Sequence, residues 1–408
     1  MTLLGKLSFK IKGKEFYLAY FFIICLYIVL LRMQSVPAAF TYSLYALSIV
    51  VAISAFFKKG ILHIGQKSDV KLLFCFFIYY IISSLLYVGR GDIPEVSWLI
   101  KDWLYSLLPI LFYILVRLSK FQIEEQLFLK VTLYSIFFLD IIALTIFAFP
   151  GSFIGGLIDL SVLSDETYSY ALTGVCGVII TGFLNVIGLS ITLLSPIKIN
   201  SIVRILCSLL FVVCVFLAGQ RTPIGGVVIV LLVFLLKFKG KGILGAIVLL
   251  ILLSLVYSKI DYEIDNISVK EVMTERYVGR FDQLKSGDSN RGDQYVNNDE
   301  KNVLQVFLGC GVGKHSPENP YSTLQMPDAM LNRIYNEMGI FGLSLFLLFF
   351  LVNMMVAIKR KDGFMIAFIA YVFFANMFNR VLFIAPTSIL PYMFIALFNW
   401  HKNVKLVK

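Results

Sequence analysis

The stretch ILCSLLFVVCVFLAGQRTPIGGVVIVLLVFLL, Ile205–Leu236, decides the fold class of this chain. Two apolar runs flank the short polar segment Gly219–Gly226, and neither run alternates in the way that a barrel strand requires. Because hydrocarbon offers no partner to open backbone groups, runs of this kind cross a membrane as helices. The whole chain has the same character, with 59% apolar and 15% charged residues among 408, and this composition excludes a soluble globular protein.

Apolar stretches able to cross roughly 30 Å of hydrocarbon predict about twelve transmembrane helices. The expected spans are Phe16–Leu31, Val36–Phe57, Leu72–Val88, Trp103–Val116, Val131–Phe149, Tyr170–Leu194, Ile205–Ala218, Pro223–Leu236, Ile243–Tyr257, Met338–Ile358, Phe364–Phe378 and Val381–Phe398. We therefore expect an all-α, polytopic bundle in three parts. Residues 1–257 hold the first nine spans, 258–337 form one large extracytoplasmic loop with short amphipathic helices, and 338–408 hold the last three spans and a cytoplasmic tail.

Lysine and arginine gather in alternate connections, which predicts the orientation of the chain. Short connections on one side carry about 22 of these residues and those on the other side about 5, so we expect both termini in the cytoplasm. The richer side includes Lys6, Lys10, Lys12, Lys14, Lys58, Lys59, Lys67, Lys71, Lys237, Lys239, Lys241, Lys359, Arg360, Lys361, Lys402, Lys405 and Lys408. The net charge of +11 follows from this pattern and favours an anionic inner leaflet, so it requires no nucleic-acid partner. We expect the first span to be retained as an anchor, since no small-residue cleavage site follows it.

The sequence predicts neither a metal site nor a cofactor. Five of the six cysteines lie in apolar spans, where they pack as small apolar groups, and no CxxC pair occurs. A cluster of acidic and amide residues in the large loop lacks the glycine and the terminal glutamate of an EF-hand; it comprises Asp288, Asn290, Asp293, Asp299 and Glu300.

Arg221 and Thr222 mark a candidate anion site where two spans meet. Thr222 suits a helix cap, Pro223 suits the first helical position, and Gly225 and Gly226 allow another chain or a ligand to approach closely. An arginine beside free helix N–H groups binds anions, and an arginine within the bilayer costs on the order of 3 kcal/mol, which argues for a purpose. The alternative is an arginine that snorkels from a tight outer turn.

Two arginines stand on a predicted amphipathic helix of the large loop. Ser268 and Glu271 form a capping box at the start of SVKEVMTERYVGRFDQL, in which Arg276 and Arg280 lie one turn apart. Both guanidinium groups can reach the membrane boundary below, either to bind a ligand or to contact lipid phosphates.

The end of the loop contains FLGCGVGKH and then MPDAMLNRIYNEMGIFG. Gly311 and Gly313, with Gly309 before them, permit a backbone nest for an oxyanion or form simple turns; the spacing does not fit a Walker loop. His315 follows as a loop histidine and Arg333 as a further candidate ligand. Asp328 lies in the first turn of the next helix, as a candidate base or as a partner of the helix dipole.

Taken in order, these features resemble the O-antigen polymerase and ligase superfamily. The resemblance lies in an RT dipeptide opening a mid-chain span (Arg221, Thr222), a GR pair in the large loop (Gly279, Arg280), the GCGVG run, and DAMLNRIYNEMGIFGLSLF leading into a span. It covers roughly residues 205 to 355. It implies a GT-C-like glycosyltransferase in a bacterial cytoplasmic membrane that needs neither cofactor nor metal.

In that family, the growing glycan moves from undecaprenyl diphosphate to a sugar hydroxyl of the next lipid-linked unit, outside the membrane. The resemblance implies that Arg221 and Arg280 bind and neutralise the diphosphate. Arg276 and Arg333 are weaker additions that match no firm motif of the family, and the other expected substrate-binding residues are Thr222, Gly311, Gly313 and His315. Asp328 stands where ligases of the superfamily usually have a histidine, which favours the polymerase and makes Asp328 the expected base. Expected partners are the lipid-linked oligosaccharide, the membrane and a chain-length regulator protein.

Two other functions remain open at this point. An O-antigen ligase would share the membrane architecture and the lipid substrate. A flippase or transporter of lipid-linked oligosaccharide is favoured by polar residues within spans, Asp140 and Asn185, although Asp140 could simply bond a neighbouring helix. The late position of the large loop breaks any symmetry between two halves and argues against the transporter.

Overall fold

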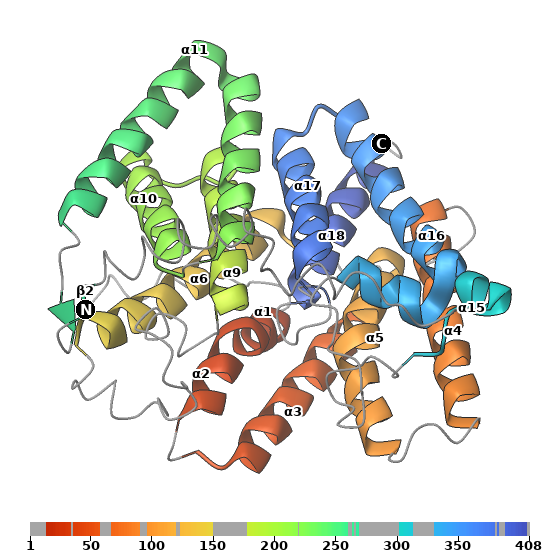
Figure 1. Ribbon diagram of the computed structural model, residues 1–408. Helices are drawn as coiled ribbons and strands as arrows, with labels where there is room; N and C mark the ends of the chain where they lie inside the picture. Colours follow the sequence, from red (N-terminus) through yellow and green to blue (C-terminus); the bar gives the residue numbers. More distant parts are fainter. Residues whose placement is uncertain are drawn as a thin grey trace, which may run out of the picture.

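The computed structural model describes residues 14–33, 36–57, 67–89, 96–119, 123–149, 178–218, 220–259, 263–264, 267–268, 302–312, 330–379, 382 and 388–405. These residues are overwhelmingly helical (Figure 1). The helices are α1 (Lys14–Phe21), the π-helical η1 (Phe22–Leu26), α2 (Tyr27–Arg32), α3 (Ala38–Phe57), α4 (Ser68–Gly89), α5 (Val96–Leu118), α6 (Glu125–Ala148), α9 (Val178–Leu194), α10 (Ser201–Leu217), α11 (Arg221–Lys259), α15 (Val303–Leu308), α16 (Met330–Lys359), α17 (Gly363–Phe378) and α18 (Ile389–Lys405). A two-residue antiparallel pair, β1 (Glu263–Ile264) and β2 (Ile267–Ser268), follows α11.

The helical membrane character expected from the sequence is confirmed, and each expected span overlaps a helix. Within the described residues, five helices are long and apolar enough to cross a membrane: Ala39–Phe57, Ser68–Leu86, Glu125–Ile146, Arg221–Lys239 and Met330–Lys359. Shorter apolar helices lie at Ile180–Leu194, Ser201–Leu217, Gly363–Phe378 and Ile389–Asn399.

Two helices are interrupted. α11 turns at Lys239, whose φ of 49° separates the two expected spans Pro223–Leu236 and Ile243–Tyr257. α16 breaks at Gly339, with φ of 64°, so that a short helical segment precedes the expected span Met338–Ile358. The left-handed backbone at Gly339 suits glycine, which has no Cβ to clash with the following carbonyl.

α17 joins two groups of helices (Figure 1). On one side it packs against α9 and α11, where the rings of Tyr371 and Phe374 cover the glycines of α11. On the other side it packs against α16, which in turn packs against α4. α18 lies along α5, with Tyr392 edge to face with Tyr113 at 6.4 Å between ring centroids. This packing holds the first turn of α11 and the first turns of α16 in fixed positions.

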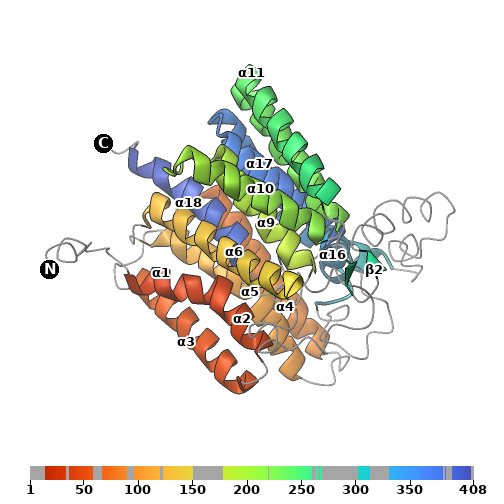
Figure 2. The ribbon, with the colours of Figure 1, turned by 90° about the vertical axis from the view of Figure 1, so that its left-hand side faces the viewer.

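One end of the bundle gathers the helix ends that adjoin the lysine-rich connections. Hydrogen bonds from side chains to backbone carbonyls tie these ends together: Lys67 to Arg117, Ser119 to Phe56, Gln126 to Pro196, Lys237 to Leu194 and Arg360 to Phe398. Figure 2 shows α1 and α18 toward one side of the molecule and β2 toward the other. The start of α11, α15 and the start of α16 belong to the opposite end, which we call the loop end.

Candidate functional site

Arg221 opens α11 at the loop end of the bundle. The helix begins two residues earlier than expected, so Thr222 lies in the first turn instead of at the cap position, and Pro223 occupies a first-turn position where its missing N–H costs nothing. The side chain of Arg221 is half-buried, and its Nη2 atom is buried. A partly buried arginine thus forms the first residue of a long helix.

The backbone of α11 is held tightly behind Arg221. A Cβ on Gly182 of α9 would lie 2.3 Å from Cγ of Pro223, and Cβ atoms on Gly225 and Gly226 would lie 2.5 Å and 2.2 Å from the rings of Phe374 and Tyr371. The close approach expected at Gly225 and Gly226 is therefore made by another helix, α17. It fixes the direction in which the first turn of α11 points.

The GCG run docks on the break of α16. The backbone N–H groups of Cys310 and Gly311 donate to the carbonyls of Asn336 and Glu337 at 2.8 Å and 3.0 Å. Tyr79 of α4 donates to the carbonyl of Met338 at 3.2 Å and to that of Leu308 at 2.8 Å. The carbonyls left open by the break are thus satisfied from two sides.

This docking gives Gly311 a role other than the expected one. A nest for an oxyanion needs free N–H groups, and those of Cys310 and Gly311 already donate hydrogen bonds to carbonyls of α16. Gly309 and Gly339 lie back to back: a Cβ on Gly309 would meet the Glu337 carbonyl oxygen at 2.2 Å, and one on Gly339 would meet that of Phe307 at 2.3 Å. The run acts as a clamp between the loop and α16.

Arg333 lies at the centre of a buried charge cluster that also contains Tyr80, Asp102 and Glu337. Its Nη2 is 2.6 Å from Oδ1 of Asp102 and its Nε is 3.0 Å from Oε2 of Glu337, one helical turn away. Tyr80 donates to the other oxygen of Asp102 at 2.5 Å. Since Arg333 is 2% exposed and Asp102 is 3% exposed, this cluster joins α4, α5 and α16 out of reach of solvent.

Arg333, expected as a further substrate ligand, lies inside this buried cluster. Two carboxylates and burial hold its guanidinium in place, so Arg333 positions the start of α16 and presents no surface to a substrate. Asp102 and Glu337 were missed in the sequence. The available signals were an acidic residue inside an apolar stretch and an arginine and a glutamate four residues apart.

Two further buried polar clusters tie the helices together. Asp69 of α4 accepts two hydrogen bonds from Arg117 of α5, at 2.7 Å and 3.1 Å, and one from Tyr113 at 2.5 Å. Asn185 of α9 donates to Asp140 of α6 at 2.9 Å, as expected if Asp140 simply bonds a neighbouring helix. The first cluster joins the consecutive helices α4 and α5, and the second joins α6 and α9, which are separated by 29 residues of the chain.

Several expected site residues lie outside the described part of the chain: Arg276, Arg280, Gly313, His315 and Asp328. The same holds for the helix after Ser268 and for the acidic cluster Asp288–Glu300. Asp328 precedes the first residue of α16, Met330, by two positions in the sequence. Among the described residues, the structure thus brings the clamp and the charge cluster together around the start of α16, and it places Arg221 at the same end of the bundle.

Comparisons of the chain with protein-family models, with curated proteins and with solved structures give no match.

Proposed function

We propose that the chain is a membrane glycosyltransferase that polymerises undecaprenyl-diphosphate-linked oligosaccharide units at the outer face of a bacterial cytoplasmic membrane. In this proposal the chain is GT-C-like, with about twelve spans and both termini in the cytoplasm. The observation that carries it is the position of Arg221 at a helix N-terminus, at the same end of the bundle as the clamp and the start of α16. That end is remote from the lysine-rich connections, as a site that meets an outward-facing lipid diphosphate requires.

The proposed mechanism assigns the leaving group to Arg221. As the bond between the anomeric carbon and the diphosphate breaks, negative charge grows on the diphosphate oxygens, and a guanidinium beside free helix N–H groups stabilises that charge. Close packing of Gly182, Gly225 and Gly226 keeps this guanidinium from drifting with its helix. Arg280 would supply the second cation, and Asp328 would accept the proton of the acceptor hydroxyl.

The clamp and the charge cluster have a supporting part in this mechanism. They fix the start of α16, and Asp328 is two residues before it in the sequence. A carboxylate that must lie within hydrogen-bond distance of an acceptor hydroxyl requires a rigid support of this kind, since a small displacement lowers the reaction rate by a large factor.

The test uses a deletion strain complemented with variants. Deletion leaves single lipid-linked repeats in place of a ladder of chain lengths, and Arg221→Ala reproduces this loss with a fall in polymerisation of about 100-fold or more. Arg221→Lys, which keeps the charge, is the matched comparison, and membrane-fraction immunoblots establish equal protein levels. A normal ladder with Arg221→Ala at wild-type levels rejects the proposal, and long chains that stay unattached to their final acceptor indicate the ligase instead.

The transporter is a second candidate because of Asp140. This carboxyl is 2% exposed, and its described contacts are with an amide and a thiol rather than with a cation. Residues of this kind often mark transport paths in membranes. Asp140→Asn separates the two functions: a polymerase keeps its ladder, whereas a transporter coupled through Asp140 leaves lipid-linked units on the cytoplasmic side. The break of α16 argues against the transporter, since its carbonyls are covered by the clamp and by Tyr79.

A further inference from the structure

A basic pocket lies at the end of the bundle that carries the lysine-rich connections. It has a volume of about 270 Å³ and lies between the α9–α10 connection, the turn of α11 and the α16–α17 turn. Its lining consists of Leu193, Leu194, Ser195, Pro196, Arg204, Lys237, Phe238, Arg360, Lys361, Asp362 and Gly363. Four cationic side chains from three separate segments thus surround one cavity that contains a single carboxylate.

These cations retain unused hydrogen-bonding capacity. Arg204 donates through Nη2 to the carbonyl of Ile197 at 2.9 Å, while its buried Nε has no hydrogen-bond partner. Lys237 uses one N–H on the carbonyl of Leu194 at 2.9 Å, and Arg360 uses Nη1 on that of Phe398 at 3.1 Å. None of the four forms an ion pair within the described part of the chain.

The electrostatics of the pocket favour an anion. Burial and the neighbouring Arg117 lower the pKa of Arg360, and Asp362 opposes them only in part. The carboxylate of Asp362 already accepts the backbone N–H of Met365 at 3.2 Å, as the cap of α17. A phosphate group would supply the missing negative charge and several acceptor oxygens at once.

The backbone around the pocket is strained. Lys239 and Lys361 have φ of 49° and 53°, and they are the two non-glycine residues with positive φ in the described ranges. Lys361 lines the pocket, and Lys239 follows directly after Phe238. Both turns hold basic side chains together at a conformational cost, which sites of function commonly carry.

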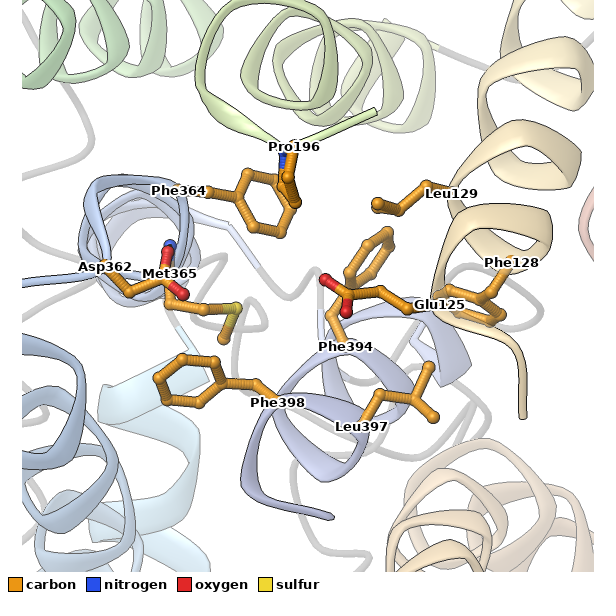
Figure 3. A pocket seen from close by; sticks show the side chains of 10 residues that line it. All are labelled: Glu125, Phe128, Leu129, Pro196, Asp362, Phe364, Met365, Phe394, Leu397 and Phe398. Carbon is orange, nitrogen blue, oxygen red and sulfur yellow. The ribbon is translucent and has the colours of Figure 1, made fainter. Parts of the chain in front are cut away.

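A mainly apolar pocket, drawn in Figure 3, adjoins the basic one. It has a volume of about 100 Å³ and shares Pro196 and Asp362 with the basic pocket. Its other lining residues are Glu125, Phe128, Leu129, Phe364, Met365, Phe394, Leu397 and Phe398. In Figure 3 the rings of Phe364, Phe394 and Phe398 surround the cavity, and the carboxyl group of Glu125 points into it. Glu125 and Asp362 would repel a phosphate here and so confine it to the basic side.

We propose that the basic pocket binds the phosphate of an anionic phospholipid from the cytoplasmic leaflet, with the adjoining apolar pocket receiving the first part of an acyl chain. A charged cavity beside an apolar one matches an amphiphile better than a soluble anion. Basic pockets between transmembrane helices on the cytoplasmic side recognise headgroups of this kind. The inference does not depend on the proposed transferase activity, which belongs to the other end of the bundle.

The test measures thermal stabilisation of the purified full-length protein in detergent by added lipid. Phosphatidylglycerol raises the melting temperature above that in phosphatidylcholine, because a ligand that binds the folded state stabilises it. The double variant Arg204→Gln, Lys237→Gln weakens the apparent affinity for phosphatidylglycerol by about 30-fold. The matched control is Lys71→Gln, Lys359→Gln, which removes two exposed cations of the same end from outside the pocket and changes the affinity by less than about threefold.

Two outcomes would overturn the inference. Equal losses in the two double variants would mean that phosphatidylglycerol responds to the general charge of this end. Stabilisation of the wild-type protein by glycerol phosphate alone, to the same extent as by phosphatidylglycerol, would assign the pocket to a soluble phosphate. Because a folding defect in the pocket variant would lower the melting temperature without lipid, the lipid-dependent rise is compared within each variant.

Discussion

Replacing Arg333 by methionine tests the buried charge cluster at the start of α16. Methionine keeps most of the length of the side chain and removes its charge. Asp102 then loses a partner at 2.6 Å and Glu337 one at 3.0 Å, while both carboxyl groups remain almost fully buried. A carboxylate without its cation in such a place has lost its compensation for desolvation.

The expected cost follows from the geometry of the cluster. Removing one partner of a buried ion pair destabilises a protein by about 3–5 kcal/mol, and the hydrogen bond from Tyr80 compensates Asp102 in part. For a chain of 408 residues, this loss corresponds to a fall in melting temperature of about 4–6 °C. The measurement is thermal unfolding in detergent, followed by the fraction of protein that remains monodisperse.

Two comparisons separate the loss of charge pairing from a loss of packing. The triple variant Arg333→Met, Asp102→Asn, Glu337→Gln removes all three charges and recovers at least half of the lost stability, because no uncompensated carboxylate remains. Lys359→Met, at an exposed position of the same helix, stays within about 0.5 kcal/mol of wild type. The reasoning is refuted if Arg333→Met has the melting temperature of the wild type, or if the triple variant is less stable than Arg333→Met.

Two further substitutions address the packing of the bundle. Gly339→Ala places a methyl group 2.3 Å from the Phe307 carbonyl oxygen on a backbone with φ of 64°, so we expect a loss of stability above about 2 kcal/mol in the same unfolding assay. Ser344→Ala, exposed on α16, is the control, and equal melting temperatures of the two variants would contradict the clamp. Asp69→Asn leaves Arg117 buried without its carboxylate, and we expect it to lower the stability by about 3 kcal/mol. Glu15→Gln, at an exposed position of α1, is the control and should have little effect. A small loss of stability in Asp69→Asn would mean that Tyr113 and the backbone hold α4 and α5 together without this ion pair.

The helices could be read from the sequence because length and apolarity determine them locally. Every expected span overlaps a helix, and the first turn of α11 was located to within two residues from Arg221, Thr222 and Pro223. The turn between the two halves of α11 was likewise expected from the lysine-rich segment around Lys239. These features depend on neighbours along the chain, which a sequence displays directly.

The candidate site was harder to predict because its contacts join distant segments. The N–H groups of Cys310 and Gly311 meet carbonyls 26 residues further along the chain, and Arg333 meets Asp102 across 231 residues. Alternating glycines are compatible both with an anion nest and with close packing, and sequence alone does not distinguish these two roles. The ion pair of Arg333 was not expected for the same reason, since its partner Asp102 lies in another helix.

The paired glycines of the clamp have a consequence for how this chain can change over generations. A Cβ on Gly309 would strike the backbone of Glu337 and Met338, and a Cβ on Gly339 would strike the backbone of Phe307 and Gly309. Both glycines also have a positive φ, which disfavours L-residues. A larger residue at one position cannot be compensated by a smaller residue at the other, because glycine already has no side chain. Natural variation should therefore spare both positions together, even where the surrounding loop drifts freely.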